Sequence, residues 1–390
     1  MRVLHLVKTS TGATWAMRQM RELVSLGLDV HVALPGGGPR VAEYEKAGVV
    51  VHDCQFDFPM RQPWRFREVA RQLRGLVGRL RPDVIHSHFV GTTLTMRLAL
   101  GTGDSTPRVF QVPGPLHLEH AIFRRVEVAT AGPMDWWIGS CRRTVEHYRQ
   151  AGVLPERVFL SYYGTDIGLF DGRGKGRLRQ ELGLDPATPI VGMVAFIYAP
   201  KAYLGQRRGL KGHEDLIDAV AICRKAAPTL RCVFVGGAWE GAESYEKRVR
   251  DYAEARCEKA AIFLGTRSDV VDLLPDIDVL VIPSLSENVG GAVESLLAGV
   301  PTVATNVGGL PDLIEDGETG WLVPPGDPER VAGAVLDALR NPDAAKERAA
   351  RGRERAARLF DCRRTAREVL DIYTGILEGP GKTTPRRGRD

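Results

Sequence analysis

The sequence has little that a secreted, disulfide-bonded or membrane-spanning protein would need. Its six cysteines lie far apart and include no C-x-x-C pair, which predicts buried, reduced thiols. The N-terminal stretch turns polar after Lys8, far short of the apolar run of a signal peptide or a transmembrane helix. We therefore expect a cytoplasmic protein, either free or peripheral to the inner face of a membrane.

A large excess of charge of one sign is also lacking. The formal net charge is +5, from 53 basic and 48 acidic residues, and the tail 379–390 carries +3 of it, from four basic residues less Asp390. A nearly neutral body offers no basic stripe for a polyanion, so we expect small molecules or a membrane surface as partners and no nucleic acid. The tail has no apolar run, and we expect it to be disordered.

What the sequence does have is a regular alternation of short Val-, Ile- and Leu-rich runs with amphipathic stretches. This alternation is typical of parallel strands joined by helical crossovers. A chain of 390 residues is too long for one compact core. A Gly- and charge-rich piece near residue 175 separates two such series, which predict an α/β protein with two Rossmann-like domains that face a central cleft.

The predicted units are a domain over 1–175, a second domain over 176–360, a helix over 361–378 that crosses back to the first domain, and the tail 379–390. The predicted strands cover 3–7, 30–34, 49–52, 84–86, 108–111, 137–139 and 158–161, then 190–196, 232–235, 262–264, 279–282, 302–304 and 320–323. The main predicted helices cover 13–26, 65–80, 142–151 and 213–227, and 327–377 is almost wholly helical.

The segment after the strand at 279–282 carries the strongest chemical pattern. It contains a glycine-containing turn, Asn288-Val289-Gly290-Gly291, and then a helix. We expect the backbone N–H groups of Val289, Gly290 and Gly291 to point to the cleft at the start of this helix. A helix N-terminus favours a phosphate or sugar oxygen, so the turn predicts an anion and polyol site.

Two carboxylates flank that turn. Glu287 precedes the helix and Glu294 lies on it, so at a rise of ~1.5 Å per residue they are about 10 Å apart and can hold two ends of one extended ligand. For an arbitrary pair of glutamates, the alternative is a helix cap and a solvated surface residue.

The same stretch resembles the signature of family-4 retaining glycosyltransferases, E-x-x-x-x-x-x-x-E, although six residues rather than seven separate Glu287 from Glu294. The tract 298–312 resembles the family's A-x-G-x-P-V-V-A-T-x-x-G-G-x-x-E/D, and 316–327 matches its D-G-x-x-G-x-L-V-x-P-G-D. Together these matches run over about 45 residues.

The resemblance implies a hexosyltransferase of the GT-B fold, with the acceptor bound by the N-terminal domain and a nucleotide sugar by the C-terminal domain. It implies that Glu287 contacts the donor sugar and Glu294 the ribose, and that Asn288 and the following turn belong to the donor site. Lys211, in a segment that resembles the family's K-G-x-x-x-L-I, binds the donor diphosphate; an ammonium at a helix start suits a phosphate oxygen.

The chain departs from the family where an arginine normally assists this lysine, because Gly192 is followed by Met193. Arg207 or Arg208, in a basic loop just before the lysine, can take its place, and a solvated surface loop is the alternative. Arg267 lies in a segment that resembles the one that meets the nucleobase, mainly through backbone. The alternative there is a simple strand-to-helix turn.

In the first domain the resemblance marks three more residues. Gly12 and Ala13 stand where the family has G-G near the diphosphate or the acceptor, and Ala13 departs from that pattern. His117 stands at about the place of a histidine beside the transferred sugar. Other histidines near strand ends, such as His86 and His88, are expected to be structural.

The function that the resemblance implies is transfer from an NDP-sugar, UDP-sugar first and GDP-sugar next, to an acceptor hydroxyl of a bacterial glycan or a secondary metabolite. The charge that develops on the leaving diphosphate is met by Lys211 and backbone dipoles, so we expect neither a metal ion nor another cofactor. Two alternatives stay open: an NDP-sugar epimerase or phosphorylase on the same fold, and a non-catalytic nucleotide-sugar-binding partner. The lack of G-x-G-x-x-G after the first strand argues against a nicotinamide dehydrogenase.

Overall fold

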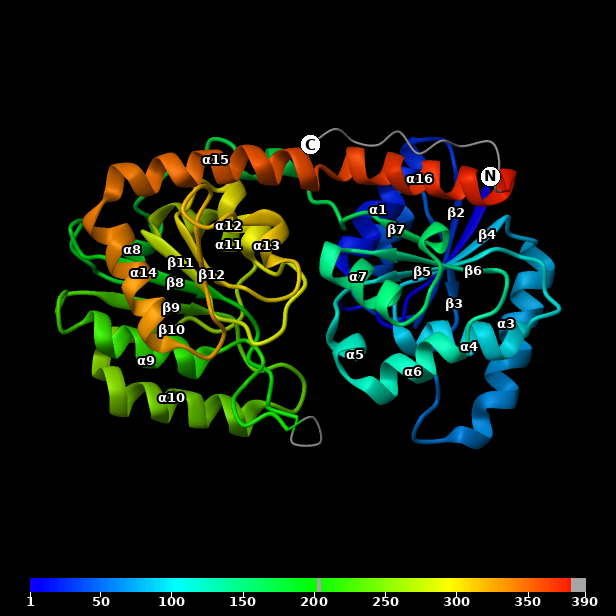
Figure 1. Cartoon of the computed structure of the whole chain (residues 1–390), viewed down its shortest axis with the longest axis horizontal. Coiled ribbons are helices and arrows are strands. Elements are labelled where there is room, and N and C mark those ends of the chain that lie inside the picture. Colours follow the sequence, from blue (N-terminus) through cyan, green and yellow to red (C-terminus); the bar gives the residue numbers. More distant parts are fainter. Residues whose placement is uncertain (202–204, 380–390) are drawn as a thin grey trace. The chain divides into compact units, whose positions relative to one another are not determined.

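The computed structural model describes residues 1–201 and 205–379. This chain forms two compact units: the first contains Met1–Asp166 and the chain from Phe360 onward, and the second contains Ile167–Leu359. Each unit is built on one parallel sheet with helices around it (Figure 1). Most of the predicted tail, residues 380–390, lies outside the described residues.

The sheet of the first unit has the strand order β3-β2-β1-β4-β5-β6-β7, with all neighbours parallel. Its strands are β1 (Arg2–Leu6), β2 (Asp29–Leu34), β3 (Val50–Asp53), β4 (Val84–Ser87), β5 (Arg108–Val112), β6 (Asp135–Gly139) and β7 (Val158–Leu160). Its α-helices are α1 (Thr14–Ser25), α2 (Val41–Lys46), α3 (Phe66–Leu80), α4 (Val90–Leu100), α5 (Leu116–Glu119), α6 (Ala121–Ala129), α7 (Arg142–Gln150) and α16 (Cys362–Glu378), with 3-10 turns η1 (Pro63–Arg65) and η2 (Pro155–Arg157).

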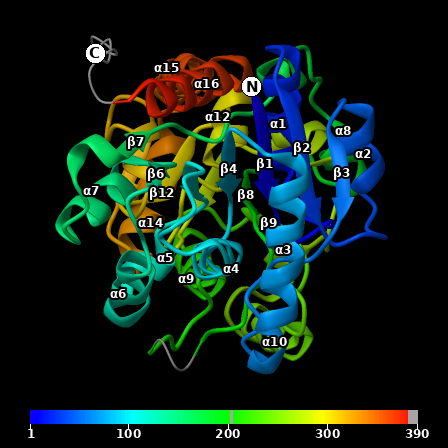
Figure 2. The ribbon, with the colours of Figure 1, turned by 90° about the vertical axis from the view of Figure 1, so that its right-hand side faces the viewer.

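Helices cover both faces of this sheet because successive residues of a strand point to opposite faces. Val3 of β1 belongs to a buried cluster with residues of α1 and α16, and its neighbour Leu4 belongs to a cluster with residues of α3 and α4. The last helix, α16, therefore lies along α1 and completes the core of the first unit (Figures 1 and 2).

The second sheet has the strand order β10-β9-β8-β11-β12-β13, again all parallel. Its strands are β8 (Ile190–Val194), β9 (Arg231–Val235), β10 (Ala261–Phe263), β11 (Val279–Ile282), β12 (Thr302–Thr305) and β13 (Trp321–Val323). Its helices are α8 (Arg177–Glu181), α9 (His213–Cys223), α10 (Glu243–Cys257), α11 (Val270–Leu273), α12 (Ala292–Leu297), α13 (Leu310–Leu313), α14 (Pro328–Arg340) and α15 (Pro342–Phe360), with 3-10 turns η3 (Ile167–Phe170), η5 (Glu258–Ala260) and η6 (Leu274–Asp276). Side chains of α9, α10 and α14 form its main buried cluster with the strands.

Each strand predicted from the sequence is present, with ends that differ by at most about two residues. The division between units differs from the predicted one: it falls after Asp166 rather than near residue 175. The intervening segment is tied to the second unit, because Arg173 pairs with Asp272 at 2.7 Å and the N–H of Gly176 donates to Asp276 at 2.5 Å. Gly-rich composition marked a change of pattern, but these tertiary contacts set the boundary.

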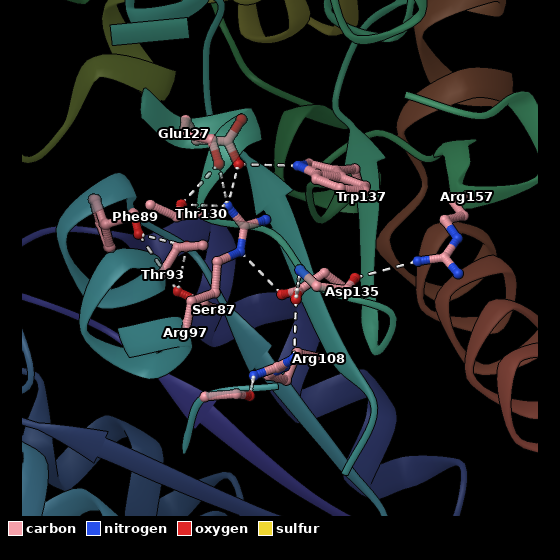
Figure 3. A network of polar contacts seen from close by, with 12 residues as sticks. Ser87, Phe89, Thr93, Arg97, Arg108, Glu127, Thr130, Asp135, Trp137 and Arg157 are labelled. Carbon is pink, nitrogen blue, oxygen red and sulfur yellow. Dashed lines mark hydrogen bonds and ion pairs between the residues drawn. The ribbon is translucent and has the colours of Figure 1, made fainter. Parts of the chain in front are cut away.

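A buried network of ions holds α6 in the first unit (Figure 3). Arg97 of α4 pairs with Glu127 of α6 at 2.7 Å and with Asp135 of β6 at 2.9 Å, and Arg108 of β5 pairs with Asp135 at 3.0 Å. The indole N–H of Trp137 donates to Glu127 at 3.0 Å. The four charged side chains are at most 1% exposed, so each carboxylate depends on its partners for stabilisation.

Candidate functional site

The candidate site lies at the carboxyl ends of β8 and β11 in the second unit, where a loop before α9 meets the turn 283–291. Gly212 has φ +75°, and a Cβ there would lie 2.0 Å from the carbonyl oxygen of Pro283. The N–H of Leu285 donates to the carbonyl of Leu210 at 2.8 Å. Only glycine allows this approach, which places the preceding residue, Lys211, beside the turn.

A second glycine holds the turn from the other side. Gly308 has φ +56°, and a Cβ there would lie 1.6 Å from the carbonyl oxygen of Glu287. The N–H of Gly309 donates to the carbonyl of Asn288 at 2.7 Å. The Gly308-Gly309 pair, part of the tract that resembles the glycosyltransferase family, therefore fixes the backbone that carries Glu287.

These constraints bring together Lys211 and Glu287, which lie far apart in the sequence. The Lys211 ammonium forms an ion pair with the Glu287 carboxylate, whose side chain is 9% exposed. The same carboxylate accepts a hydrogen bond from the Ser284 hydroxyl at 3.1 Å and one from the Asn288 N–H at 3.1 Å. The Lys211 Nζ also lies 6.0 Å from the centre of the Tyr198 ring.

A cavity of about 140 Å³ opens onto this ion pair. Its lining includes Lys211, Glu287, Ser284 and Tyr198. The sequence analysis did not single out Tyr198 or Ser284. Both follow the carboxyl end of a parallel strand, the position where ligands of open α/β sheets are bound, and that rule was the signal that could have found them.

A second cavity, of about 220 Å³, adjoins the first, and the two share Gly291 and three residues that follow β8, namely Val194, Ala195 and Phe196. The second cavity is also lined by Gly290, Thr266, Arg267 and Glu294. The two glutamates of the predicted signature therefore line two adjoining cavities, Glu287 the first and Glu294 the second. Arg267 pairs there with Asp269 at 2.8 Å and with Glu181 at 2.7 Å.

The glycine turn differs in detail from the expectation. The helix α12 begins at Ala292 and has six residues, so its dipole is weaker than that of a long helix. Gly290 and Gly291 line the cavities, whereas Val289 and Asn288 line neither. Among the backbone hydrogen bonds of turns, loops and helix caps in residues 1–201 and 205–379, none has the N–H of Gly290 or Gly291 as its donor.

Arg208 does not lie with the other predicted donor residues. Its guanidinium pairs with Asp215 and, at 3.0 Å, with Asp218 on α9, and it lines a different cavity, with Glu214 and Tyr245. The two acids satisfy its charge, so the side chain turns toward α9 rather than toward Lys211.

The remaining predicted residues belong to the first unit. Gly12 and Ala13 follow β1, and Ala13 is the N-cap of α1 with φ 59°, a left-handed conformation that glycine adopts more readily. His117 lies on α5, where burial lowers its pKa to about 4, so its imidazole is neutral at pH 7. Its Nε2 is buried without a hydrogen-bond partner in the described chain.

Three histidines of the first unit form a buried cluster that the sequence analysis did not predict. His5 of β1, His86 of β4 and His88, which directly follows β4, are fully buried, and one ring nitrogen of each lies within 4.8 Å of the others. Burial lowers the pKa of all three, that of His5 to about 3. The His86 ring nitrogen Nδ1 contacts the Tyr373 hydroxyl of α16.

Hydrogen bonds define how two of these rings are oriented. The Tyr163 hydroxyl donates to the carbonyl of Gln111 at 3.0 Å and lies 2.8 Å from His88 Nδ1. Because its proton is used, Tyr163 accepts from His88 Nδ1–H, which leaves His88 Nε2 to accept from His5 Nδ1–H at 2.9 Å. The cluster therefore joins β1, β4 and the chain after β7.

The chain contains one Asp-x-Asp sequence, at Asp276 and Asp278. Both lie before β11, at the amino edge of the sheet, and line neither of the two adjoining cavities. Asp276 accepts from the N–H of Leu178 at 2.7 Å, and Asp278 pairs with Arg179 at 2.9 Å. These carboxylates therefore hold α8 against the chain that precedes β11.

No helix within the described ranges combines the length and the apolar character that a bilayer crossing requires.

Both halves of the chain match models of known protein families. A family model described as glycosyl transferases group 1 matches residues 202–355, and one described as glycosyltransferase family 4 matches residues 12–169. A Bacillus subtilis protein named as glycosyltransferase EpsD is 33% identical over 368 residues, which cover 90% of this chain and 91% of that protein.

A D-inositol 3-phosphate glycosyltransferase of Thermomonospora curvata is 35% identical over 250 residues, 61% of this chain and 55% of that enzyme. The chain thus spans about half the length of the first such enzymes it matches. Among solved structures, Anabaena HepE in complex with UDP has a TM-score of 0.80 at 22% identity, covering 96% of this chain and 100% of that one. This likeness confirms the predicted GT-B fold class.

Proposed function

The chain belongs to the glycosyl transferases group 1 family, of family-4 type, and from that premise we propose that it moves a hexose from a nucleoside-diphosphate sugar to an acceptor hydroxyl, with retention at the anomeric carbon. The acceptor is a hydroxyl of a bacterial glycan or a secondary metabolite. The observation that carries the proposal is the Lys211–Glu287 ion pair in the lining of the first cavity, which adjoins a second cavity lined by Glu294.

The first cavity supplies what departure of a nucleoside diphosphate requires. Negative charge develops on the leaving diphosphate, and we assign Lys211 and the N–H of Gly291, two residues of the lining, to meet it. Glu287 accepts hydrogen bonds through a fixed carboxylate, and we assign it to the hydroxyls of the donor sugar. When the donor binds, its diphosphate replaces Glu287 as the main partner of Lys211.

The second cavity fits the nucleoside end of the same ligand. Glu294 is assigned to the ribose hydroxyls, which a carboxylate can accept from, and the strand-to-helix turn with Thr266 and Arg267 to the base. The shared residues after β8 and Gly291 make one continuous surface for an extended donor. The spacing of six residues between the two glutamates is thus compatible with one acid in each cavity.

For the donor base we propose uridine first and guanosine next. The similar fold of Anabaena HepE was solved with UDP-glucose, which supports uridine. A thermal-shift screen with UDP, GDP, ADP and dTDP tests this directly: UDP should raise the Tm most, because a ligand that binds only the folded state stabilises it. A larger shift with another nucleotide would contradict the choice of base.

We also propose that transfer needs no metal ion or other cofactor, because Lys211 and the backbone amides of the turn supply the positive potential. Turnover in the presence of excess EDTA should equal turnover without it. A loss of rate that Mg²⁺ or Mn²⁺ restores would contradict this part of the proposal.

Three residues of the first unit, Gly12, Ala13 and His117, are proposed to contact the donor or the acceptor. Replacement of the histidine in His117→Ala should therefore lower kcat.

The deciding experiment incubates the protein with UDP-glucose alone and follows both products. A transferase releases UDP and glucose slowly by donor hydrolysis. An epimerase instead converts the sugar without releasing UDP, and a binding partner leaves the donor intact. Glu287→Gln should abolish the hydrolysis, while the exposed Glu243→Gln of α10 should hydrolyse at the wild-type rate.

A further inference from the structure

A tyrosine of a neighbouring helix holds the short turn that carries Lys211. The N–H of Gly212 donates to the carbonyl of Gly209 at 2.9 Å, so residues 209–212 form one turn, the lysine turn. The N–H of Gly209 donates in the same way to the hydroxyl of Tyr245 at 2.6 Å. Tyr245 belongs to α10, which lies beside α9 (Figure 1). The tyrosine therefore fixes the first amide of the turn on which the lysine stands.

The Tyr245 hydroxyl has a second partner, which sets its direction. It donates its proton to the carboxylate of Glu214, in the first turn of α9. Tyr245 is buried. Burial raises its pKa, and the hydrogen bond to Glu214 adds to this effect, so the hydroxyl keeps its proton at neutral pH. Because a hydroxyl has one proton and two lone pairs, donation to Glu214 leaves a lone pair for the N–H of Gly209.

The lysine turn is packed tightly against this tyrosine. A Cβ at Gly209 would lie 2.9 Å from the Tyr245 hydroxyl oxygen and 3.0 Å from the carbonyl oxygen of Tyr198. On its other side the turn is bound to the segment after β11, because the N–H of Leu285 donates to the carbonyl of Leu210 at 2.8 Å. Two separate elements therefore hold the backbone of the lysine turn.

Arg208 adds a third attachment directly before the lysine turn. Its guanidinium pairs with Asp215 and Asp218 of α9. Asp218 also accepts from the Tyr252 hydroxyl at 2.6 Å and pairs with Arg256 at 2.7 Å, both on α10. The side chain that the sequence predicted as a diphosphate ligand thus ties the start of the turn to α9.

We propose that Tyr245 is a positioning residue of the donor site. Through the Gly209 amide it holds the lysine turn, and so keeps Lys211 where the donor diphosphate binds. This inference rests on the proposed function. A lysine ammonium stands on a flexible four-carbon chain, and Glu287 restrains it only until the diphosphate replaces that carboxylate. From then on, the backbone of the lysine turn determines where the positive charge lies.

The test measures the affinities of the full chain for UDP and for uridine by titration calorimetry. Uridine lacks the diphosphate, so its affinity does not depend on Lys211. Tyr245→Phe leaves the Gly209 N–H without its acceptor and should bind UDP about tenfold more weakly than the wild type does. It should bind uridine equally well, which also shows that the variant is folded. An unchanged UDP affinity, or equal losses for both ligands, would overturn the proposal.

The matched control is Tyr252→Phe. Tyr252 also lies on α10 and also donates its hydroxyl to a carboxylate of α9, but that carboxylate is Asp218 and the hydroxyl does not meet the lysine turn. We therefore expect Tyr252→Phe to bind UDP as the wild type does. A loss as large as that of Tyr245→Phe would refute a specific role for Tyr245.

A double variant separates positioning of the lysine from a general effect on the fold. In a Lys211→Ala background, Tyr245→Phe should lower the affinity for UDP no further, because the tyrosine acts through the lysine. The same fold-loss in both backgrounds would show that Tyr245 does not act through Lys211, and the proposal would fail.

Variants of Glu214 test the hydrogen bond from its other end. Glu214→Gln keeps an acceptor for the Tyr245 hydroxyl and should bind UDP within about twofold of the wild type. Glu214→Ala removes the acceptor and should bind UDP about threefold or more weakly. Equal affinities of these two variants would contradict a role for the hydroxyl.

The wild type distinguishes failure of this role from failure of the proposed function. If the thermal-shift screen selects another base, the matching nucleoside diphosphate and nucleoside replace UDP and uridine in these titrations. If the wild type binds none of the four diphosphates and does not hydrolyse UDP-glucose, the proposed function fails and the role of Tyr245 falls with it. If the wild type binds and hydrolyses, and Tyr245→Phe matches it, only the role of Tyr245 is refuted.

Discussion

The ammonium of Lys211 is paired with the carboxylate of Glu287 in the second unit. Each of these groups therefore already has a partner of opposite charge before a donor arrives. An anionic donor must compete with Glu287 for Lys211, and the two side chains are energetically coupled.

Lys211→Ala and Glu287→Ala should each lower kcat by about 100-fold or more, as loss of a group that stabilises charge in the transition state does. Because the two act as a unit, the double variant should lose far less than the product of the single losses. Steady-state kinetics with a saturating donor measure this, with the exposed Lys225→Ala of the segment after α9 as the control. Independent, multiplicative losses would show that the pair does not act together.

Gly308→Ala should destabilise the second unit and reduce donor binding, because a Cβ at Gly308 would lie 1.6 Å from the carbonyl oxygen of Glu287. The expected loss is about 2 kcal/mol or more of the free energy of unfolding, from backbone strain and displacement of the turn. Gly299 also has a positive φ, but a Cβ there meets nothing within 4 Å. Gly299→Ala should therefore cost only about 1 kcal/mol; equal losses in urea denaturation would contradict the contact.

Glu127→Gln should lower the free energy of unfolding by about 3–5 kcal/mol, since it leaves the buried Arg97 short of a counter-charge. Arg125→Met, an exposed change on the same helix, should have little effect. Calorimetry of both variants compares them with the wild type. A small effect of Glu127→Gln would mean that water reaches the network.

The three buried histidines predict acid sensitivity. Burial lowers the pKa of His5 to about 3 and also lowers those of His86 and His88, whereas in the unfolded chain they titrate near ~6.5. The unfolded state therefore binds more protons below that pH, and stability falls as the pH decreases from about 6.5 toward the folded pKa values. At about pH 5 His5 alone should cost about 2 kcal/mol, and His86 and His88 act in the same direction.

Urea denaturation at about pH 7.5 and about pH 5 measures this dependence. His5→Gln should take up about one proton fewer on unfolding than the wild type does. A free energy of unfolding that does not change over this range would show that the cluster is solvated or already protonated.

The sequence predicted the strands well because both faces of each sheet are buried, which leaves nearly continuous apolar runs such as Val279–Ile282. It also predicted Lys211 and Glu287, through sequence motifs that resemble those of the family. An apolar run and a motif can each be recognised within one segment, although the motif glycines Gly212 and Gly308 meet backbone atoms of other segments.

What the sequence did not reveal depends on pairs of distant residues. The ion pair of Lys211 with Glu287 joins residues that are 76 positions apart in the sequence. Arg208 was proposed as a diphosphate ligand. Its guanidinium instead forms ion pairs with Asp215 and Asp218, which both lie on α9. The contact of His86 with Tyr373 joins residues that are 287 positions apart in the sequence. No local pattern encodes which of several partners a side chain will choose.

The return of α16 to the first unit affects how the protein is made. Ala366, Val369 and Tyr373 are fully buried in the same cluster as β1 and α1. A ribosome that has released residues 1–166 has produced a sheet with one of its covering helices missing, and that helix is the last described element to emerge. Domains generally fold as units during synthesis, so the second unit can finish before the first. The part of the protein that is translated earliest is completed last.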